Sequence, residues 1–282
     1  MSPAADRPDP GGDALGWYLY GVVAGDSAPP QVDEPGLAVD GAYEVQAIVE
    51  GPLAGVASRV SLEEFDEATL PECLADAAWL EQKIRAHEQV LDRVLRDRSI
   101  VPCRFCTVYR NEAELRKFLA ERKDALEAAL DRVQGQIEVG VKAFIDRHRF
   151  AAREAVENEA VRKLEERVSA AEGGRAYLER RRLDQLLATE LDRFRRIACG
   201  EIHSRLLAAA ADGLTLPLQA TEVSGRDDEM LFHGAYLVAA DGRVFDAALG
   251  SIAADYRDSG VEFELTGPWP PYNFVPAQLR AA

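Results

Sequence analysis

The ten residues Leu265–Phe274 constrain the fold of this chain more than any other stretch of its sequence. They follow Val261–Glu264, a strict alternation of apolar and acidic residues that predicts a half-buried strand. Three prolines in the stretch fix φ and remove three backbone donors, so we expect the strand to end before them. The stiff backbone would then hold Trp269, Tyr272 and Phe274 as an aromatic clasp, buried against helices of a second domain.

This ending resembles that of the gas vesicle protein F/L family (GvpF and GvpL). The residues that carry the resemblance are Gly267, Pro268, Trp269, Pro270, Pro271, Tyr272 and Phe274. Four earlier segments match the family in the same order: 18–23, 101–109 with Phe105 and Thr107, 135–142, and 174–178 with Tyr177 and Leu178. The resemblance covers residues 15–276. It departs at Cys103 and Cys106, where the family more often has an apolar residue and a glycine.

The resemblance implies an accessory protein of gas vesicle formation, either a minor vesicle component or an assembly factor. The implied partners are the small, apolar, GvpA-type shell protein and other gas vesicle accessory proteins. A shell subunit exposes apolar surface and free strand edges before it polymerises. We therefore expect this protein to bind the shell protein, prevent its aggregation and help vesicle nucleation, at the gas vesicle and in the cytoplasm.

The charge of the chain argues against two classes of partner. The 282 residues carry a formal net charge of −16, whereas binding nucleic acid needs clustered Lys and Arg. An anionic membrane surface also repels an acidic chain, and no run of 18 apolar residues predicts a membrane span. Residues 1–14 read as a disordered tail without the pattern of a signal peptide, so the four cysteines indicate a reducing cytoplasm.

Hydrophobic periodicity predicts an N-terminal α+β domain over residues 15–145. Strands are expected at 17–23, 43–49, 56–60, 101–109 and 136–144, and helices at 72–97 and 112–130. Asn111 lies three residues before Glu114, which is a helix-start signature. This order favours an antiparallel-rich sheet with helices on one face, a ferredoxin-like variant.

The remaining residues, 146–282, predict a second domain with two parts. Residues 146–211 read as a hairpin of two helices with its corner at Gly173-Gly174. An α+β unit follows over 212–282, with strands at 216–223, 230–239 and 261–266, a turn at 224–228 and a helix at 242–258. The fold class expected is therefore α+β, with two ferredoxin-like or modified ferredoxin-like domains, the second carrying a long helical hairpin.

The sequence lacks the common motifs for catalysis, cofactor binding and metal binding, and we expect none of these functions. The sequence contains no HExxH, GxGxxG, Walker or GxSxG pattern. Cys103 and Cys106 would lie on opposite faces of a strand, so we interpret them as small buried hydrophobes rather than a redox or zinc pair. His87 falls on the apolar stripe of helix 72–97 and is interpreted as a core histidine. The acidic run Asp227–Glu229 reads as a solvated hairpin tip.

One face of the N-terminal sheet is the candidate partner-binding surface. Its expected members are Tyr18, Tyr20, Ile48, Arg104, Glu138 and Lys142. Tyr and Arg are favoured anchors of protein interfaces. A cross-strand charge pair between Arg104 and Glu138 is the structural alternative. The apolar stripe of the hairpin 146–211 is the rival surface, because helix-in-groove binding would use it.

A second function from a different class stays open at this point. Ferredoxin-like domains host many activities, so the chain could instead be a ligand-binding or enzymatic protein. Such a protein should show converging polar groups with shifted pKa values in a pocket, and the sequence proposes none.

Overall fold

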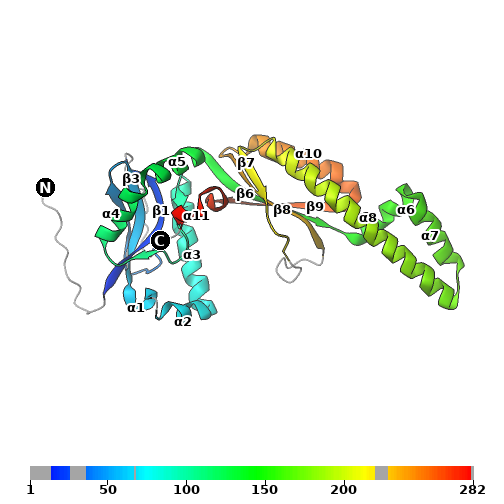
Figure 1. The fold of residues 1–282 in the computed structure, drawn as a ribbon, viewed down its shortest axis with the longest axis horizontal. Helices are drawn as coiled ribbons and strands as arrows, with labels where there is room; N and C mark the ends of the chain where they lie inside the picture. The colour runs from blue at the N-terminus through cyan, green and yellow to red at the C-terminus, as the bar shows by residue number, and fades with distance from the viewer. Residues whose placement is uncertain (1–13, 26–35, 67, 220–227, 281–282) are drawn as a thin grey trace. The chain divides into compact units, whose positions relative to one another are not determined.

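The computed structural model describes residues 14–25, 36–66, 68–219 and 228–280, so the predicted tail lies almost entirely outside the described residues. The chain forms two compact units, Met1–Gly135 with Pro270–Ala282 and Gln136–Trp269 (Figure 1). Each unit contains an antiparallel sheet with helices, so the α+β class with two domains is confirmed. The division falls ten residues before the expected boundary, because the strand at 136–145 belongs to the second sheet.

The first sheet contains five strands: β1 (Leu15–Ala24), β2 (Val45–Glu50), β3 (Leu53–Ser61), β4 (Val101–Pro102) and β5 (Val108–Tyr109). The order is β2-β3-β1-β4, with β5 also paired to β1, and every pairing is antiparallel. Gly51 has a φ of +57°, which suits the two-residue turn between β2 and β3. The predicted strand 101–109 is wrong in its middle, where the backbone turns between β4 and β5.

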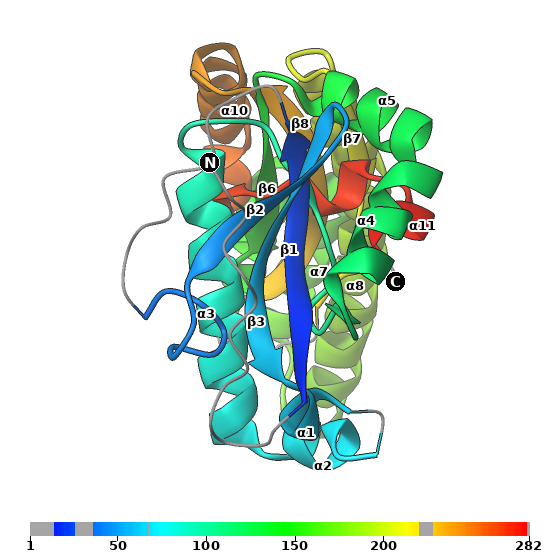
Figure 2. The same ribbon diagram turned by 90° about the vertical axis from the view of Figure 1, so that its left-hand side faces the viewer.

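Helices cover both faces of this sheet, against the expectation of one face (Figure 2). The predicted helix 72–97 is two helices, α2 (Leu70–Ala75) and α3 (Ala77–Leu95), after the short α1 (Leu62–Phe65). The α3 helix packs on the Tyr18 face of β1. The other helices, α4 (Glu112–Glu121) and α5 (Lys123–Val133), cover the opposite face, where Leu115 and Leu119 meet Leu19 over Gly55. The central strand is buried on both faces, as in sheets with helices on both sides.

The second sheet contains four strands: β6 (Gln136–Ile145), β7 (Asp212–Thr215), β8 (Glu229–Ala239) and β9 (Val261–Trp269), in the antiparallel order β7-β8-β6-β9. One face packs on α8 (Gly173–Leu207) and α10 (Arg243–Tyr256), which a short 3-10 turn, η1 (Arg257–Ser259), follows. The predicted strand 216–223 is misplaced. Strand β7 precedes it, residues 216–219 form no strand, and the rest, with the turn at 224–228 apart from Asp228, lies outside the described residues.

The hairpin contains three helices rather than two: α6 (Arg147–Glu157), α7 (Glu159–Ala170) and α8. Asn158 ends α6 and caps α7, because its side chain accepts a hydrogen bond from the Ala160 amide at 3.0 Å. Gly173, with a φ of +54°, begins the 35-residue α8 at the predicted corner. Figure 1 shows α6 and α7 beside the N-terminal half of α8.

Strand β9 continues through Pro268 to Trp269, against the expectation that it ends before the prolines. The register shifts between Glu138 and Gly140, where Gly267 has a φ of +113° and joins Pro268 through a cis peptide. Among the described strands, β9 lies at the edge of the sheet, so no further strand needs a backbone N–H at position 268. A proline, which has none, is therefore tolerated there. The chain then enters the first unit with η2 (Tyr272–Phe274) and α11 (Ala277–Arg280).

Candidate functional site

The predicted sheet surface of the first unit is not exposed. Tyr18 and Tyr20 are fully buried, and Ile48 is 5% exposed. Helix α3 covers the two tyrosines with its own Val90 and Leu91, and Phe65 belongs to the same core cluster. These side chains therefore stabilise the core and do not present a docking surface in this structure.

Arg104, Glu138 and Lys142 do not form one surface either. Arg104 is exposed in the turn between β4 and β5 of the first sheet. Glu138 and Lys142 lie on β6 of the second sheet, where Glu138 is 5% exposed and Lys142 faces Glu264 of β9 in the register. The expected cross-strand pair of Arg104 and Glu138 is therefore wrong, because sequence order suggested that their strands were neighbours.

Cys103 and Cys106 both lie in the turn between β4 and β5. Cys103 is 1% exposed, and burial raises the pKa of its thiol to about 12. Cys106 has a φ of +64°, and desolvation likewise raises its thiol pKa to about 12. Thr107 closes the turn by donating its hydroxyl proton to the Arg104 carbonyl at 2.8 Å. Such thiols are poor nucleophiles, which agrees with the reading of Cys103 as a buried hydrophobe.

A hydrogen-bond relay runs through the core of the first unit. The Cys106 amide donates to the Tyr18 hydroxyl at 3.0 Å, and this hydroxyl lies 2.9 Å from His87 Nδ1. On the other side of the ring, His87 Nε2 lies 3.1 Å from the Tyr272 hydroxyl, which donates to Glu88 Oε1 at 3.1 Å. Each hydroxyl has one proton, and Tyr272 donates its proton to Glu88, so the Tyr272 oxygen accepts the Nε2–H of a neutral imidazole. Nδ1 of this imidazole has no proton and accepts the hydrogen bond from the Tyr18 hydroxyl.

Burial shifts the pKa values of the groups in this relay. Desolvation lowers the pKa of His87 to about 4 and raises the pKa values of Glu88, Tyr18 and Tyr272. The imidazole is 1% exposed and every polar atom of its ring has a partner. The prediction of a satisfied core histidine is confirmed. Its partner Tyr272, 185 residues away in sequence, could not be assigned from the pattern alone.

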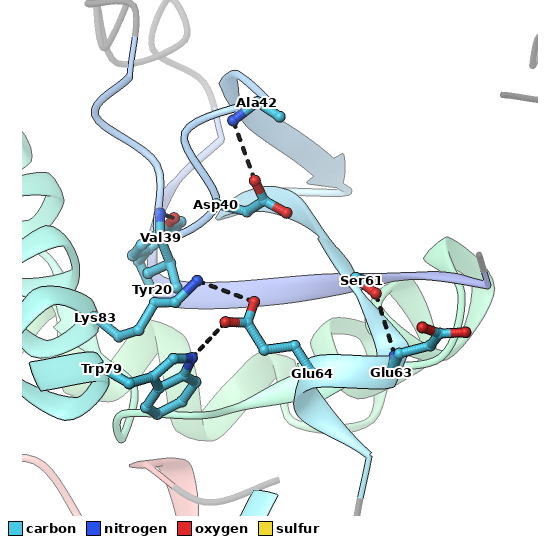
Figure 3. A network of polar contacts seen from close by, with 9 residues as sticks. All are labelled: Tyr20, Val39, Asp40, Ala42, Ser61, Glu63, Glu64, Trp79 and Lys83. Carbon is cyan, nitrogen blue, oxygen red and sulfur yellow. Dashed lines mark hydrogen bonds and ion pairs between the residues drawn. The ribbon is translucent and has the colours of Figure 1, made fainter. Parts of the chain in front are cut away.

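A second polar network fixes the segments that border α3 (Figure 3). The Glu64 carboxylate of α1 accepts hydrogen bonds from the Trp79 indole and from Lys83, whose ammonium lies 3.0 Å away. Lys83 is almost buried and its ammonium lies 5.6 Å from the centre of the Phe65 ring. The Val39 amide donates to the Tyr20 hydroxyl at 2.8 Å. The ion pair of Glu64 with Lys83 therefore anchors α1 to α3, and the hydrogen bond from Val39 to Tyr20 anchors residue 39 to β1.

The aromatic residues of the C-terminal motif separate into two environments. Trp269 is 43% exposed on the second sheet, where its indole N–H donates to Thr266 Oγ1 at 3.3 Å. Tyr272 and Phe274 pack in the first unit, and Phe274 is 4% exposed. The expected burial of all three against helices of the second domain is wrong, because the chain passes between units at Trp269 and Pro270.

The hairpin of the second unit exposes large apolar side chains at the start of α8. Tyr177 is 67% exposed and Leu178 is 56% exposed, both on the first turns of α8. Further along, α6 and α8 enclose a hollow of about 310 Å³, which we call the α6–α8 groove. Its apolar wall consists of Phe150, Ala151, Leu187, Ala188 and Leu191, and its polar rim consists of Arg147, His148 and Asp184.

The described parts of the chain hold neither a cluster of metal ligands nor a helix that could cross a membrane. Within residues 14–25, 36–66, 68–219 and 228–280, no three His, Cys, Asp or Glu side chains gather as metal ligands would. In the same residues, every helix is too short or too polar to cross a membrane.

Comparison with known proteins identifies the family. The family model described as gas vesicle synthesis protein GvpL/GvpF matches residues 16–276. Gas vesicle protein L of Streptomyces sp. (strain CB03234) is 32% identical over 226 residues, which cover 80% of each chain. Gas vesicle protein F of Haloferax mediterranei is 25% identical over 268 residues, which cover 94% of this chain and 95% of the relative.

Solved structures show the same fold. The crystal structure of GvpF from Anabaena sp. PCC7120 matches with a TM-score of 0.68 and 20% identity, over 93% of this chain and 98% of that one. GvpF from Microcystis aeruginosa matches with a TM-score of 0.60 and 18% identity, over 93% and 99%. The family model and the sequence relatives together span both units, and the chain therefore belongs to the GvpL/GvpF family of gas vesicle proteins.

Proposed function

We propose that this chain is an accessory protein of gas vesicle assembly that binds a GvpA-type shell protein. It would act in the cytoplasm and at the vesicle, either as a minor structural component or as an assembly factor, beside other gas vesicle accessory proteins. The observation that carries the proposal is the family match over residues 16–276, which includes both units.

The physical features of the chain support this role. An unassembled shell subunit exposes apolar surface and strand edges that would aggregate. The second unit offers exposed apolar side chains, and among the described strands β2, β4, β5, β7 and β9 each pair with one neighbour only. The net charge of −16 would keep a complex with an apolar subunit dispersed, because like-charged complexes repel each other.

The enzymatic alternative receives no such support. The groups whose pKa values shift most, such as His87, Tyr272 and Cys103, lie inside the core of the first unit. They do not line the α6–α8 groove or the hollow beside α3 at Ala38 and Arg85. Their shifts arise from desolvation in a packed interior, which is common for structural groups.

An aggregation assay tests the proposed function. Shell protein is diluted from denaturant into buffer with increasing amounts of the full chain, and light scattering is followed over time. We expect scattering to fall as the ratio of chain to shell protein rises, with both proteins in one peak on gel filtration. An unrelated acidic protein of similar net charge is the control. Equal scattering with the chain and with the control would contradict the proposal.

A further inference from the structure

The α6–α8 groove is preformed because its floor belongs to the hydrophobic core. Phe150 is 2% exposed and its ring lies 5.3 Å from the ring of Phe194 on α8. Leu191 is 5% exposed in the same core cluster. An occupant would therefore contact side chains that are already ordered, and binding would cost little conformational entropy.

Small residues leave room for a helix at the two edges of the groove. Ala151 lies on α6 and Ala188 lies on α8, and both line the hollow. Alanine at such positions allows the backbone of a third helix to approach closely. The volume of about 310 Å³ suits one or two large apolar side chains rather than an extended ligand.

The groove continues along one stripe of α8 to the exposed tip of the hairpin. Tyr177, Arg181, Asp184 and Ala188 follow one another at spacings of four, three and four residues, so they lie on one face of the helix. Tyr177, the aromatic residue of this stripe, is 67% exposed. The stripe therefore joins an aromatic anchor, a guanidinium, the Asp184 carboxylate and an apolar hollow in one line, which is the arrangement of a helix-binding surface.

The charge beside the stripe is positive, although the chain as a whole is acidic. Residues 175–182 contain four arginines and one glutamate, and Glu179 pairs with Arg182 at 2.9 Å. In the described part of the chain, neither Arg180 nor Arg181 has a carboxylate within ion-pair distance. A second hollow of the hairpin is more acidic, because its lining contains four glutamates, Glu154, Glu157, Glu159 and Glu190, and two arginines, Arg153 and Arg193. An acidic helix would be attracted to the arginines beside the stripe and repelled by the more acidic second hollow.

We propose that the α6–α8 groove and its stripe bind an amphipathic helix of the shell protein, with carboxylates beside its apolar face. This inference rests on the proposed function and names the surface that performs it. A second copy of this chain is a poorer occupant, because a two-fold symmetric contact through this face would bring the arginines of both copies together.

Co-purification of the shell protein with the tagged full chain tests the proposal. Ala188→Arg places a long charged side chain in the groove and should reduce the recovered ratio of shell protein to chain by roughly tenfold or more. Thr189→Arg adds the same side chain at the next, exposed position and should leave recovery unchanged. Ile197→Arg changes the acidic hollow and should also leave recovery unchanged. Arg181→Glu should reduce recovery by a few-fold and weaken its dependence on salt.

The outcomes separate the two proposals. If the unchanged chain recovers no shell protein, the proposed function fails, and the occupant of the groove fails with it. If Ala188→Arg recovers as much shell protein as the unchanged chain, the assignment of the α6–α8 groove as the binding surface is wrong, while the proposed function stands. If Ala188→Arg instead turns a dimer into a monomer in sedimentation and leaves shell recovery intact, the occupant is a second copy and the proposal is overturned. Circular dichroism and melting curves identify any variant that fails to fold, and Ala151→Arg then replaces it from the α6 side.

Discussion

His87→Phe gives a quantitative test of the hydrogen-bond relay in the first unit. Phenylalanine keeps the ring contacts, because His87 stacks on Tyr20 at 5.7 Å and meets the edge of Phe105 at 5.9 Å. The substitution removes the hydrogen bonds to Tyr18 and Tyr272, although each hydroxyl keeps its other partner, the Cys106 amide or Glu88. At pH 7 the loss of two buried hydrogen bonds should lower the free energy of unfolding by about 2 kcal/mol.

The difference in the free energy of unfolding between the unchanged chain and His87→Phe should depend on pH in a defined direction. Burial lowers the His87 pKa from 6.5 to about 4, so the unfolded chain binds the proton first as the pH falls. The neutral imidazole therefore contributes its full stability above pH 6.5, and this stability is lost as the pH falls towards 4. The loss corresponds to about 3 kcal/mol. The pKa of Glu88 is raised by burial and acts in the opposite direction, but Glu88 is present in both proteins and largely cancels in the comparison.

Urea unfolding followed by tryptophan fluorescence measures this difference. Trp17 and Trp79 lie in the first unit, whereas Trp269 lies in the second, so a Trp269→Phe background makes the signal report the first unit alone. We expect the deficit of His87→Phe to be about 2 kcal/mol at pH 7 and to vanish or change sign near pH 4. A deficit that stays constant between pH 7 and pH 4 would refute the neutral, buried imidazole. A deficit near zero at pH 7 would refute the relay itself.

Three further predictions address other parts of the chain. Cys103→Ser should destabilise the first unit by about 1–2 kcal/mol in urea unfolding, and Cys106→Ser should destabilise it less. Bound zinc in elemental analysis of the unchanged protein would contradict the interpretation that neither thiol binds a metal. Truncation after Trp269 should increase hydrogen exchange in α3 and β1, while β6 and β8 keep their protection. Faster exchange in β6 and β8, with unchanged exchange in α3 and β1, would show that residues 270–282 stabilise the second unit instead. Among the described residues, the Oε2 atom of Glu179 has no hydrogen-bond partner, and Glu179 is 7% exposed. Glu179→Leu should therefore stabilise the second unit by about 1 kcal/mol, and a lower melting temperature would argue against this.

Local patterns in the sequence predicted most of the secondary structure. Alternation located β2 and β6, a short apolar run located β1, and the Asn111 cap located the start of α4, where the Asn111 side chain accepts from the Glu114 amide at 2.9 Å. These features depend on residues close together in sequence, so periodicity and capping chemistry are sufficient to find them. The same local patterns identified His87 as a core residue and Gly173 as the corner of the hairpin.

The sequence alone determined the family, the α+β class and the two-domain organisation of this protein. Tertiary structure decided which faces are exposed. Alternation places Tyr18 and Tyr20 on one face of β1, but only the packing of α3 shows that this face is buried. Likewise, only the structure shows that Tyr272 meets His87 in the first unit and that α6 and α8 leave a groove between them. Periodicity assigns a side chain to a face of its own element, whereas exposure depends on which distant element covers that face.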